Sequence, residues 1–249
     1  MRCMDDTDHQ ADPADARGQL GRNLTYGMLD TIGRSIVHGR YEQQSFPTEG
    51  ELSRLHGVSR SVTREAVKML TAKGLLSARP RQGTTVQNKA SWNLFDTDVL
   101  RWLLDRKFSI ELLRHFNELR VAIEPEAAAL AARHADPADV ETIRRGLDRM
   151  AAADGGHDDI LEADIEFHVS ILQASRNPFY RQFRDVVTTA LRTSIRFTNR
   201  LTGHSASIAA HRAVLDAIAA ADPDGARTAM RVIIADVLAL IERAGMPVE

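Results

Sequence analysis

The stretch that decides the fold is "SRSVTREAVKML", residues 59–70. Arg60, Arg64 and Lys68 follow one another at i, i+4 and i+8, so they line one side of a helix. The opposite side is apolar and consists of Val62, Ala66, Met69 and Leu70. Such a helix packs through one face and presents guanidinium groups on the other, and its width fits the major groove of DNA. A solvated cationic surface is the alternative, because most basic stripes are of that kind.

The segments on either side of this helix favour DNA binding. Thr48 and Glu51 have the spacing of a capping box at the start of a short helix, "HGVS" at residues 56–59 predicts a turn, and Ser59 is placed to cap the basic helix. After the helix, "LLSA" and "TTVQ" around "RPRQG" predict a two-stranded hairpin with Gly83 in the turn. Between Arg54 and Lys89 the only acid is Glu65. The sequence therefore predicts a winged helix-turn-helix whose wing lies against a phosphate backbone or minor groove.

Composition sets broad limits on the protein. The chain has 249 residues, 43% of them hydrophobic and 27% charged, and a formal net charge of -2. Its single cysteine, Cys3, cannot form a disulfide within the chain, which fits a reducing compartment. The start of the chain has no apolar run typical of a signal peptide, and no stretch approaches the ~18 apolar residues of a membrane span. These features predict a cytoplasmic protein.

Composition also divides the chain near residue 90 into a mixed first part and a helical second part. We expect a mainly α protein whose N-terminal winged helix-turn-helix carries a small β-hairpin wing and whose second part is an all-α bundle. The predicted boundaries are a disordered tail (1–22), the winged helix-turn-helix (23–88), a linker (89–96) and an all-helical effector-binding and dimerisation domain (97–245). Helices in the second part are expected at 97–106, 109–134, 138–153, 158–175, 178–200, 206–221 and 223–244.

Four polar residues of the second part lie on faces that are otherwise apolar. Asp164 and His168 lie in the middle of the apolar arc of "LEADIEFHVSIL", residues 161–172. His211 and Arg120 lie on the apolar faces of two further helices. Because an unpaired buried charge is costly, we expect the three helices to bring these groups together. A closed network, with Asp164 paired to Arg120, is one explanation, and a polar ligand site is the other.

The residues from Phe46 to Val86, "FPTEGELSRLHGVSRSVTREAVKMLTAKGLLSARPRQGTTV", resemble the DNA-binding domain of GntR-family bacterial transcription regulators. The resemblance implies that Ser59, Arg60 and Arg64 contact operator bases and phosphates, and that Gln82 and Gly83 form the tip of the wing. The chain departs from the pattern at Gly50, where related proteins often have arginine. We add Ser61, Lys68 and Arg81 to the DNA-binding set, because they lie beside the basic stripe and in the wing.

The second part resembles the FCD effector domain of the FadR branch through "DIEFH" and, further on, "AAHRAVLDAIAAADPDGARTAM". "SWNLFDTDVLRWLL" is most similar to regulators of sugar-acid catabolism, such as galactonate-type operon repressors. The resemblance implies one divalent metal held by an aspartate and three histidines, with a carboxylate effector beside it. Asp164, His168 and His211 match three ligands, whereas Ile233 stands where the fourth is expected.

Two interpretations of the site stay open. Three nitrogen and oxygen ligands can hold zinc or a similar ion and leave coordination positions for water or a ligand. Alternatively, Arg120, His168 and His211 bind a carboxylate directly while Asp164 accepts from hydroxyl groups, since the planar fork of arginine suits a carboxylate. We favour direct binding of a sugar acid at this point.

The sequence as a whole predicts a homodimeric, ligand-responsive repressor that binds operator DNA and a small carboxylate effector and has no membrane partner. An enzyme is one alternative, because an aspartate and histidines around a metal can activate water. However, the sequence contains no nucleophile elbow and no phosphate-binding glycine loop, so we expect no catalytic activity. A DNA-binding protein with a closed polar core and no effector is the other alternative.

Overall fold

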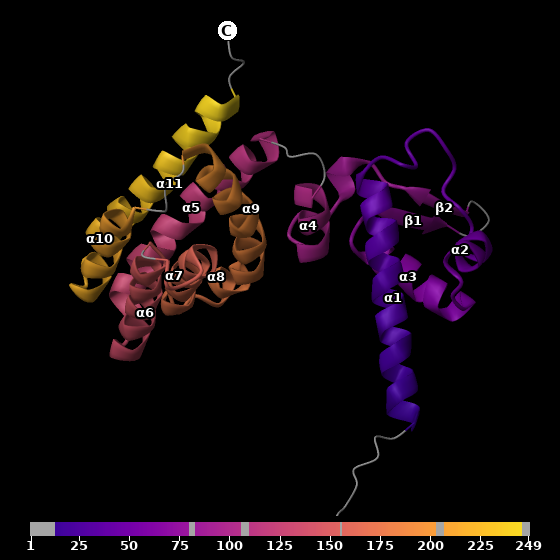
Figure 1. Ribbon diagram of the computed structural model, residues 1–249, viewed down its shortest axis with the longest axis horizontal. Coiled ribbons are helices and arrows are strands. Elements are labelled where there is room, and N and C mark those ends of the chain that lie inside the picture. Colours follow the sequence, from indigo (N-terminus) through magenta and orange to yellow (C-terminus); the bar gives the residue numbers. More distant parts are fainter. Residues whose placement is uncertain (1–12, 80–82, 106–109, 155, 203–206, 246–249) are drawn as a thin grey trace, which may run out of the picture. The chain divides into compact units, whose positions relative to one another are not determined.

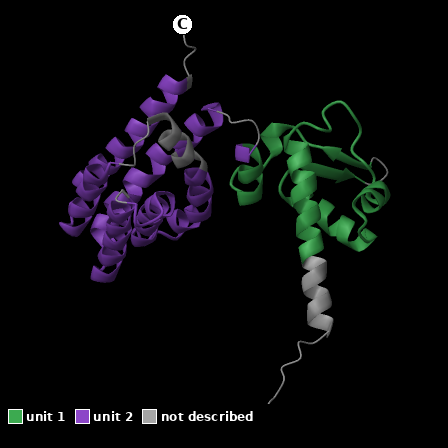
Figure 2. Ribbon diagram, in the orientation of Figure 1, with its two compact units in different colours: residues 1–103 green, residues 104–249 purple. Residues whose placement is uncertain are grey.

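A computed structural model describes residues 13–79, 83–105, 110–154, 156–202 and 207–245. The chain forms two compact units, unit 1 (residues 1–103) and unit 2 (residues 104–249), which Figure 2 colours separately. Unit 1 is a helical domain with one small sheet, and unit 2 is all-helical in its described residues. The predicted fold class is therefore confirmed. Among the described residues, no helix has both the length and the apolar composition needed to cross a membrane.

Unit 1 has the element order of a winged helix-turn-helix (Figure 1). Its elements are α1 (Pro13–Val37), α2 (Glu49–His56), α3 (Arg60–Ala72), β1 (Leu76–Arg79), β2 (Gly83–Val86), the short 3₁₀ helix η1 (Lys89–Ser91) and α4 (Thr97–Asp105). α1 begins at Pro13, within the tail predicted at 1–22, of which residues 1–12 lie outside the described residues. The sequence signal is Asp12-Pro13, because proline suits the first position of a helix.

Local sequence explains the turn between α2 and α3. Thr48 and the side chain of Glu51 form the predicted capping box, and Gly57 ends α2 with a φ of 63°. Ser59 caps α3 by accepting a hydrogen bond from the backbone N–H of Val62. β1 and β2 then pair antiparallel, with Leu76 opposite Val86. These contacts hold α3 against α1 and α2 and leave its basic side exposed.

The division between the units lies after Leu103, further along the chain than the linker predicted at 89–96. Trp92 and Trp102 are both buried in the core of unit 1, beside residues such as Leu29 and Leu70. The first part of the helix predicted at 97–106 therefore belongs to unit 1. Residues 87–98 are mostly polar, but Trp92 within them lies in the core of unit 1, as does Trp102 in the helix that follows.

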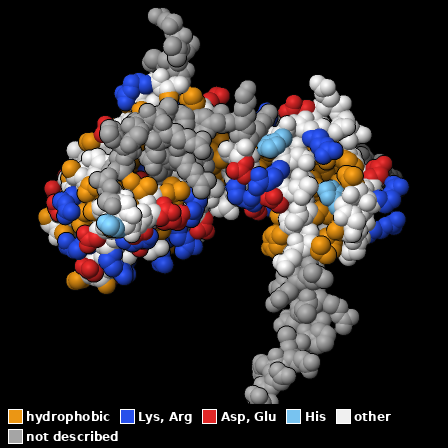
Figure 3. Space-filling view, viewed as in Figure 1, with side chains coloured by type: hydrophobic (Ala, Val, Ile, Leu, Met, Phe, Trp, Pro, Cys, Tyr) orange, Lys and Arg blue, Asp and Glu red, His pale blue; other side chains and the backbone are white. Residues whose placement is uncertain are grey.

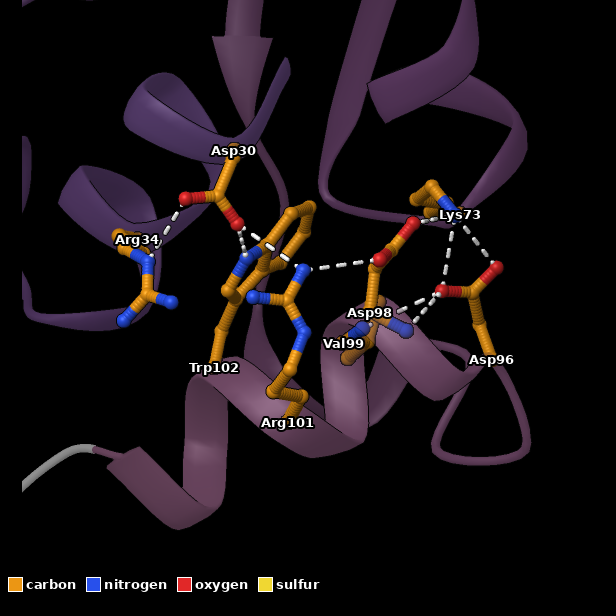
Figure 4. A network of polar contacts seen from close by, with 8 residues as sticks. All are labelled: Asp30, Arg34, Lys73, Asp96, Asp98, Val99, Arg101 and Trp102. Atoms are coloured by element: carbon orange, nitrogen blue, oxygen red, sulfur yellow. Dashed lines mark hydrogen bonds and ion pairs between the residues drawn. The ribbon is translucent and has the colours of Figure 1, made fainter. Parts of the chain in front are cut away.

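Polar contacts fix α4 to unit 1 (Figure 4). The indole N–H of Trp102 donates to Asp30 of α1 over 2.7 Å. Lys73, the residue that ends α3, donates from Nζ to Asp96 over 2.7 Å and contacts Asp98 at 2.9 Å. Asp96 in turn accepts from the backbone N–H groups of Asp98 and Val99, which caps α4. Polar contacts thus join both ends of α4 to helices of unit 1.

Unit 2 is a helical bundle in which α5 and α7 contact most of the other helices. The elements are α5 (Ile110–His134), α6 (Pro137–Asp154), α7 (Ile160–Ala174), α8 (Pro178–Gln182), α9 (Arg184–Thr202), α10 (Ile208–Ala219) and α11 (Pro223–Gly245). α5 packs along α11 and also contacts α7, α9 and α10, while α7 packs against α6 and α9 (Figure 1). One prediction changes, because the helix expected at 178–200 divides at Phe183 into α8 and α9. α5 is a single helix that contains Pro125.

Candidate DNA-binding surface and buried polar site

The basic stripe of α3 is exposed in unit 1. The described residues predicted to bind DNA, all with exposed side chains or backbone, are Ser59, Arg60, Ser61, Arg64, Lys68 and Gly83. Figure 3 shows Lys and Arg side chains grouped at the edge of unit 1, near the position of α2 in Figure 1. On the face shown, unit 2 instead carries acidic and basic side chains intermixed. Positive charge is thus concentrated between Arg54 and Lys89, where Glu65 is the only acid, although the whole chain is close to neutral.

Three details of this surface bear on DNA recognition. Arg64 Nε lies 3.3 Å from Glu49 Oε2, which joins the exposed side of α3 to the first turn of α2. Gly50 has open space around the position of a Cβ atom, so a larger residue would meet no obstacle at its Cβ there. Gly83 opens β2 with a φ of 80°, a conformation that favours glycine. Arg81 and Gln82, the other predicted wing residues, lie outside the described residues.

The four polar residues that were predicted to lie on otherwise apolar helix faces are close together in unit 2. Arg120 comes from α5, Asp164 and His168 come from α7, and His211 comes from α10. All four are buried, with exposures of 3%, 6%, 2% and 1% in that order. The His168 and His211 rings are edge to face, 5.6 Å apart between centroids. The three helices therefore surround one polar site inside an apolar bundle.

Asp164 is the centre of the site. Its Oδ1 atom lies 3.2 Å from Nε2 of His168 and 3.5 Å from Nε2 of His211. Oδ1 of Asp164 and Nε2 of His211 have no hydrogen-bond partner, although both are fully buried. Buried polar atoms without partners are rare, and an unplaced ion or water is a common reason for them. The three residues each offer one ligand atom, and these atoms lie within 4.8 Å of one another.

These separations match the edges of a metal coordination shell. Ligands at about 2.0–2.2 Å from zinc lie roughly 3.0–3.5 Å apart in tetrahedral or octahedral geometry. The distances from Asp164 to the two imidazoles, 3.2 and 3.5 Å, fall in that range. Nδ1 of His211 faces the backbone carbonyl of Ser207 at 2.8 Å, so its Nε2 is left as the ligand atom. The donor set therefore fits a divalent ion with three protein ligands.

The sequence interpretation missed Glu124, which is 1% exposed and lies between Arg120 and His168. Its carboxylate accepts from Nε and Nη2 of Arg120, over 2.6 and 3.3 Å. The remaining Nη1 of Arg120 donates to Asn117 over 3.1 Å. The closed-network alternative, in which Arg120 pairs with Asp164, is thus corrected, because Glu124 takes that place. The i, i+4 spacing from Arg120 was the available signal, since a buried arginine needs a carboxylate partner.

The charged groups of the site stabilise one another in their charged forms. Burial would raise the pKa of Glu124, but the Arg120 guanidinium and His168 outweigh it and lower that pKa to about 2. Burial would likewise raise the pKa of Asp164, yet His168 and His211 bring it well below its usual range. Burial would lower the pKa of His168, but Glu124 and Asp164 raise it to about 9. Without an ion, two buried cations therefore balance two buried carboxylates.

Comparisons with known proteins agree with both halves of the chain. The family described as bacterial regulatory proteins, gntR family, matches residues 28–86, and the FCD domain matches residues 115–236. The galactonate operon transcriptional repressor of Escherichia coli is 33% identical over 86% of this chain and 94% of its own length. A putative L-lactate dehydrogenase operon regulatory protein of the same organism is 32% identical over 85% and 83%. Among solved structures, Lar of Listeria monocytogenes has a TM-score of 0.55 at 19% identity, covering 88% of this chain and 97% of that one, which shows the fold alone.

Proposed function

Because the chain belongs to the GntR family of bacterial regulatory proteins and carries an FCD domain, we propose that it represses an operon for sugar-acid or related carboxylate catabolism. Membership of this family makes it a ligand-responsive transcription regulator rather than an enzyme. The relatives named for galactonate and lactate operons support this ligand class. The observation that carries the proposal is the set of unpartnered buried ligand atoms of Asp164 and His211, which lie beside His168.

We assign one divalent ion to this site, held by Asp164, His168 and His211. Ile233, which stands where the resemblance placed a fourth ligand, is a buried core residue of α11 and offers no donor atom. A three-ligand ion keeps more open coordination positions than a four-ligand one. When bound, the ion would supply Lewis-acid attraction for oxygen ligands, and the chain's own residues would hold and orient it.

Charge supports a carboxylate as the effector. The carboxylates of Glu124 and Asp164 offset the Arg120 charge and only part of the charge of a divalent ion bound by neutral histidines. A buried excess of positive charge favours an anionic ligand. The guanidinium of Arg120 is already engaged by Glu124 and Asn117, so direct pairing of an effector with Arg120 loses support. We therefore propose that a hydroxy acid or sugar acid binds at the open positions of the ion.

DNA binding and effector binding are proposed to be coupled in a homodimer. Two α3 helices would enter successive major grooves of a pseudo-palindromic operator, about 34 Å apart. An effector with different affinity for two arrangements of the dimer would change the spacing of these helices, with a coupling free energy of roughly 1–3 kcal/mol. Repression relieved by the effector is the proposed direction.

A thermal-shift screen tests this function. Metal-free protein is melted with aldonic, uronic and hydroxy acids, each with and without one equivalent of zinc. We expect a sugar acid to raise the melting temperature only in the presence of zinc, because a ligand of the folded state stabilises it. Asp164→Asn should abolish the zinc-dependent shift. A shift by the acid that is equally large without metal would instead support direct binding, and no shift with any acid would contradict the proposed ligand class.

A further inference from the structure

The two imidazoles at the site are oriented in the same way by different means. In each ring Nε2 faces Asp164 and Nδ1 faces an outer oxygen, and Nε2 of His168 also lies 3.5 Å from Nη2 of Arg120. The outer oxygen for His211 is the carbonyl of Ser207, which is fixed because it belongs to the turn that starts α10. The outer oxygen for His168 is Oε2 of Glu124, 2.6 Å away. A side chain on another helix thus does for His168 what the backbone does for His211.

Glu124 can hold this position because it is itself held. Nε and Nη2 of Arg120 reach its two carboxylate oxygens, and Arg120 is in turn bound by Asn117. Asn117 donates to the carbonyl of Leu113 over 2.8 Å and approaches Ser194 of α9 at 3.5 Å. All these side chains are buried. The clamp leaves the Glu124 carboxylate with its Oε2 atom directed at the His168 ring.

We propose that Glu124, clamped by Arg120, is a positioning residue that orients His168 as a metal ligand, and that Arg120 serves this clamp instead of binding the effector. The inference rests on the proposed metal site. Metal-bound histidines generally give their second nitrogen to a carboxylate or carbonyl, which fixes the ring and raises its basicity. The contact between Nδ1 of His168 and Glu124 is short, although the N–H is not aligned on the oxygen. An ion that draws Nε2 toward it would turn the ring within this clamp.

Zinc affinity, measured by competition with a chromogenic chelator, tests the inference on the full-length protein. Glu124→Gln keeps the size of the side chain but removes its charge, and we expect zinc affinity to fall roughly 10–100-fold. Glu118→Gln is the matched control, because Glu118 is an exposed carboxylate on the same helix that pairs with Arg114, and it should leave zinc affinity unchanged. His168→Ala should reduce binding further, since it removes a ligand.

A second variant separates positioning from folding. Glu124→Gln leaves the buried charge of Arg120 without its counter-ion, so this variant can lose stability as well as zinc affinity. Replacing both residues, as Arg120→Met with Glu124→Leu, removes the pair together and retains all three ligands. We expect the double variant to melt cooperatively without metal and still to bind zinc more than tenfold more weakly than wild type. The visible absorption of bound Co²⁺ should also change at saturation, which a purely structural role would not produce.

The outcomes are distinct. Wild-type zinc affinity in a folded Glu124→Gln or double variant, with an unchanged cobalt spectrum, would overturn the positioning role and leave the metal site standing. Failure of the wild-type protein to bind zinc would overturn the proposed metal site and this inference together. Reduced zinc affinity in both variants, with Glu118→Gln unaffected, would support the inference.

Discussion

Trp102 of α4 donates its indole N–H to the carboxylate of Asp30 in α1, 72 positions earlier in the chain. The ring itself is fully buried in the core of unit 1. A helix that the sequence pattern assigns to the effector domain is therefore a structural part of the DNA-binding unit. It follows that the DNA-binding unit cannot be delimited by the end of its wing at Val86.

A fragment of residues 1–105 should fold more stably than one of residues 1–88. The shorter fragment loses Trp92 and Trp102, and each large apolar side chain contributes about 1.5–3 kcal/mol when buried. It also exposes the part of α1 that they cover. Urea denaturation followed by circular dichroism compares the two free energies of unfolding. Equal stability of the two fragments would show that α4 only rests on the unit without supporting it.

Gly33 of α1 is predicted to be sensitive to the smallest possible substitution. A Cβ atom there would overlap the ring of Trp102. Gly33→Ala should destabilise unit 1 by about 1–3 kcal/mol through overpacking. Gly27 is the matched control in the same helix, because a Cβ atom there meets nothing within 4 Å, and Gly27→Ala should stabilise by about 0.5–1 kcal/mol. Thermal melts that rank the two variants the other way would contradict the packing of α4.

The ion pairs of Lys73 predict how the stability of unit 1 depends on pH. Burial would raise the pKa of Asp98, but Lys73 and Arg101 outweigh it and lower that pKa below 3.8. Burial would lower the pKa of Lys73, but Asp96 and Asp98 outweigh it and raise that pKa above 10.5. The contribution of Asp98 is therefore lost as pH falls through its lowered pKa, and that of Lys73 is lost as pH rises through its raised pKa.

We expect the free energy of unfolding of unit 1 to be highest between about pH 4 and pH 10, the range set by the reference pKa values of the two groups. Lys73→Met should cost about 1 kcal/mol in that range, a small figure because Asp98 is partly exposed. The variant should also lose the alkaline decline. Urea titrations from pH 3 to pH 11 measure both effects. A constant difference between wild type and variant at every pH would rule out this ion pair as the cause.

Features that depend on neighbouring residues could be predicted from the sequence more completely than contacts between distant helices. The capping box of Thr48 and the turn at Gly57 depend on neighbours within a few residues, so they could be predicted in place. The inward-facing positions of Asp164 and His168 were also visible, because helical periodicity alone fixes which face a residue takes. The partner of Arg120 could not be predicted, because the sequence does not show which of several carboxylates its helix would bring close to it. Only the packed bundle shows that Glu124 is that partner.

Arg64 should carry sequence-specific DNA binding. Its guanidinium is exposed on α3 and joined through Nε to Glu49, which leaves the outer nitrogens for a base edge. Arg64→Ala should weaken binding to a DNA site selected by the wild-type protein from a random pool by about 1–3 kcal/mol, with zinc affinity unchanged. Arg145→Ala, an exposed arginine of unit 2, is the control in fluorescence anisotropy titrations. Undiminished preference for the selected site in Arg64→Ala would exclude this residue from base recognition.

Ile233 offers a gain-of-function test of the buried site. It is 8% exposed and belongs to the core cluster that contains Phe167, whose ring lies 5.0 Å from that of His211. Ile233→His should destabilise the metal-free protein by roughly 1–3 kcal/mol, because it buries a polar ring without a partner. The same variant should bind zinc more tightly than wild type, because a fourth ligand closes the shell. Melting with and without zinc measures both effects: the melting temperature of the metal-free protein should fall, while the increase in melting temperature on adding zinc should grow.

Ile233→Asn is the control, because it buries a polar group of similar size that is a poorer zinc ligand. It should lower the melting temperature of the metal-free protein without enlarging the zinc-induced increase. A zinc-induced rise no larger in Ile233→His than in Ile233→Asn would mean that position 233 does not face the ion.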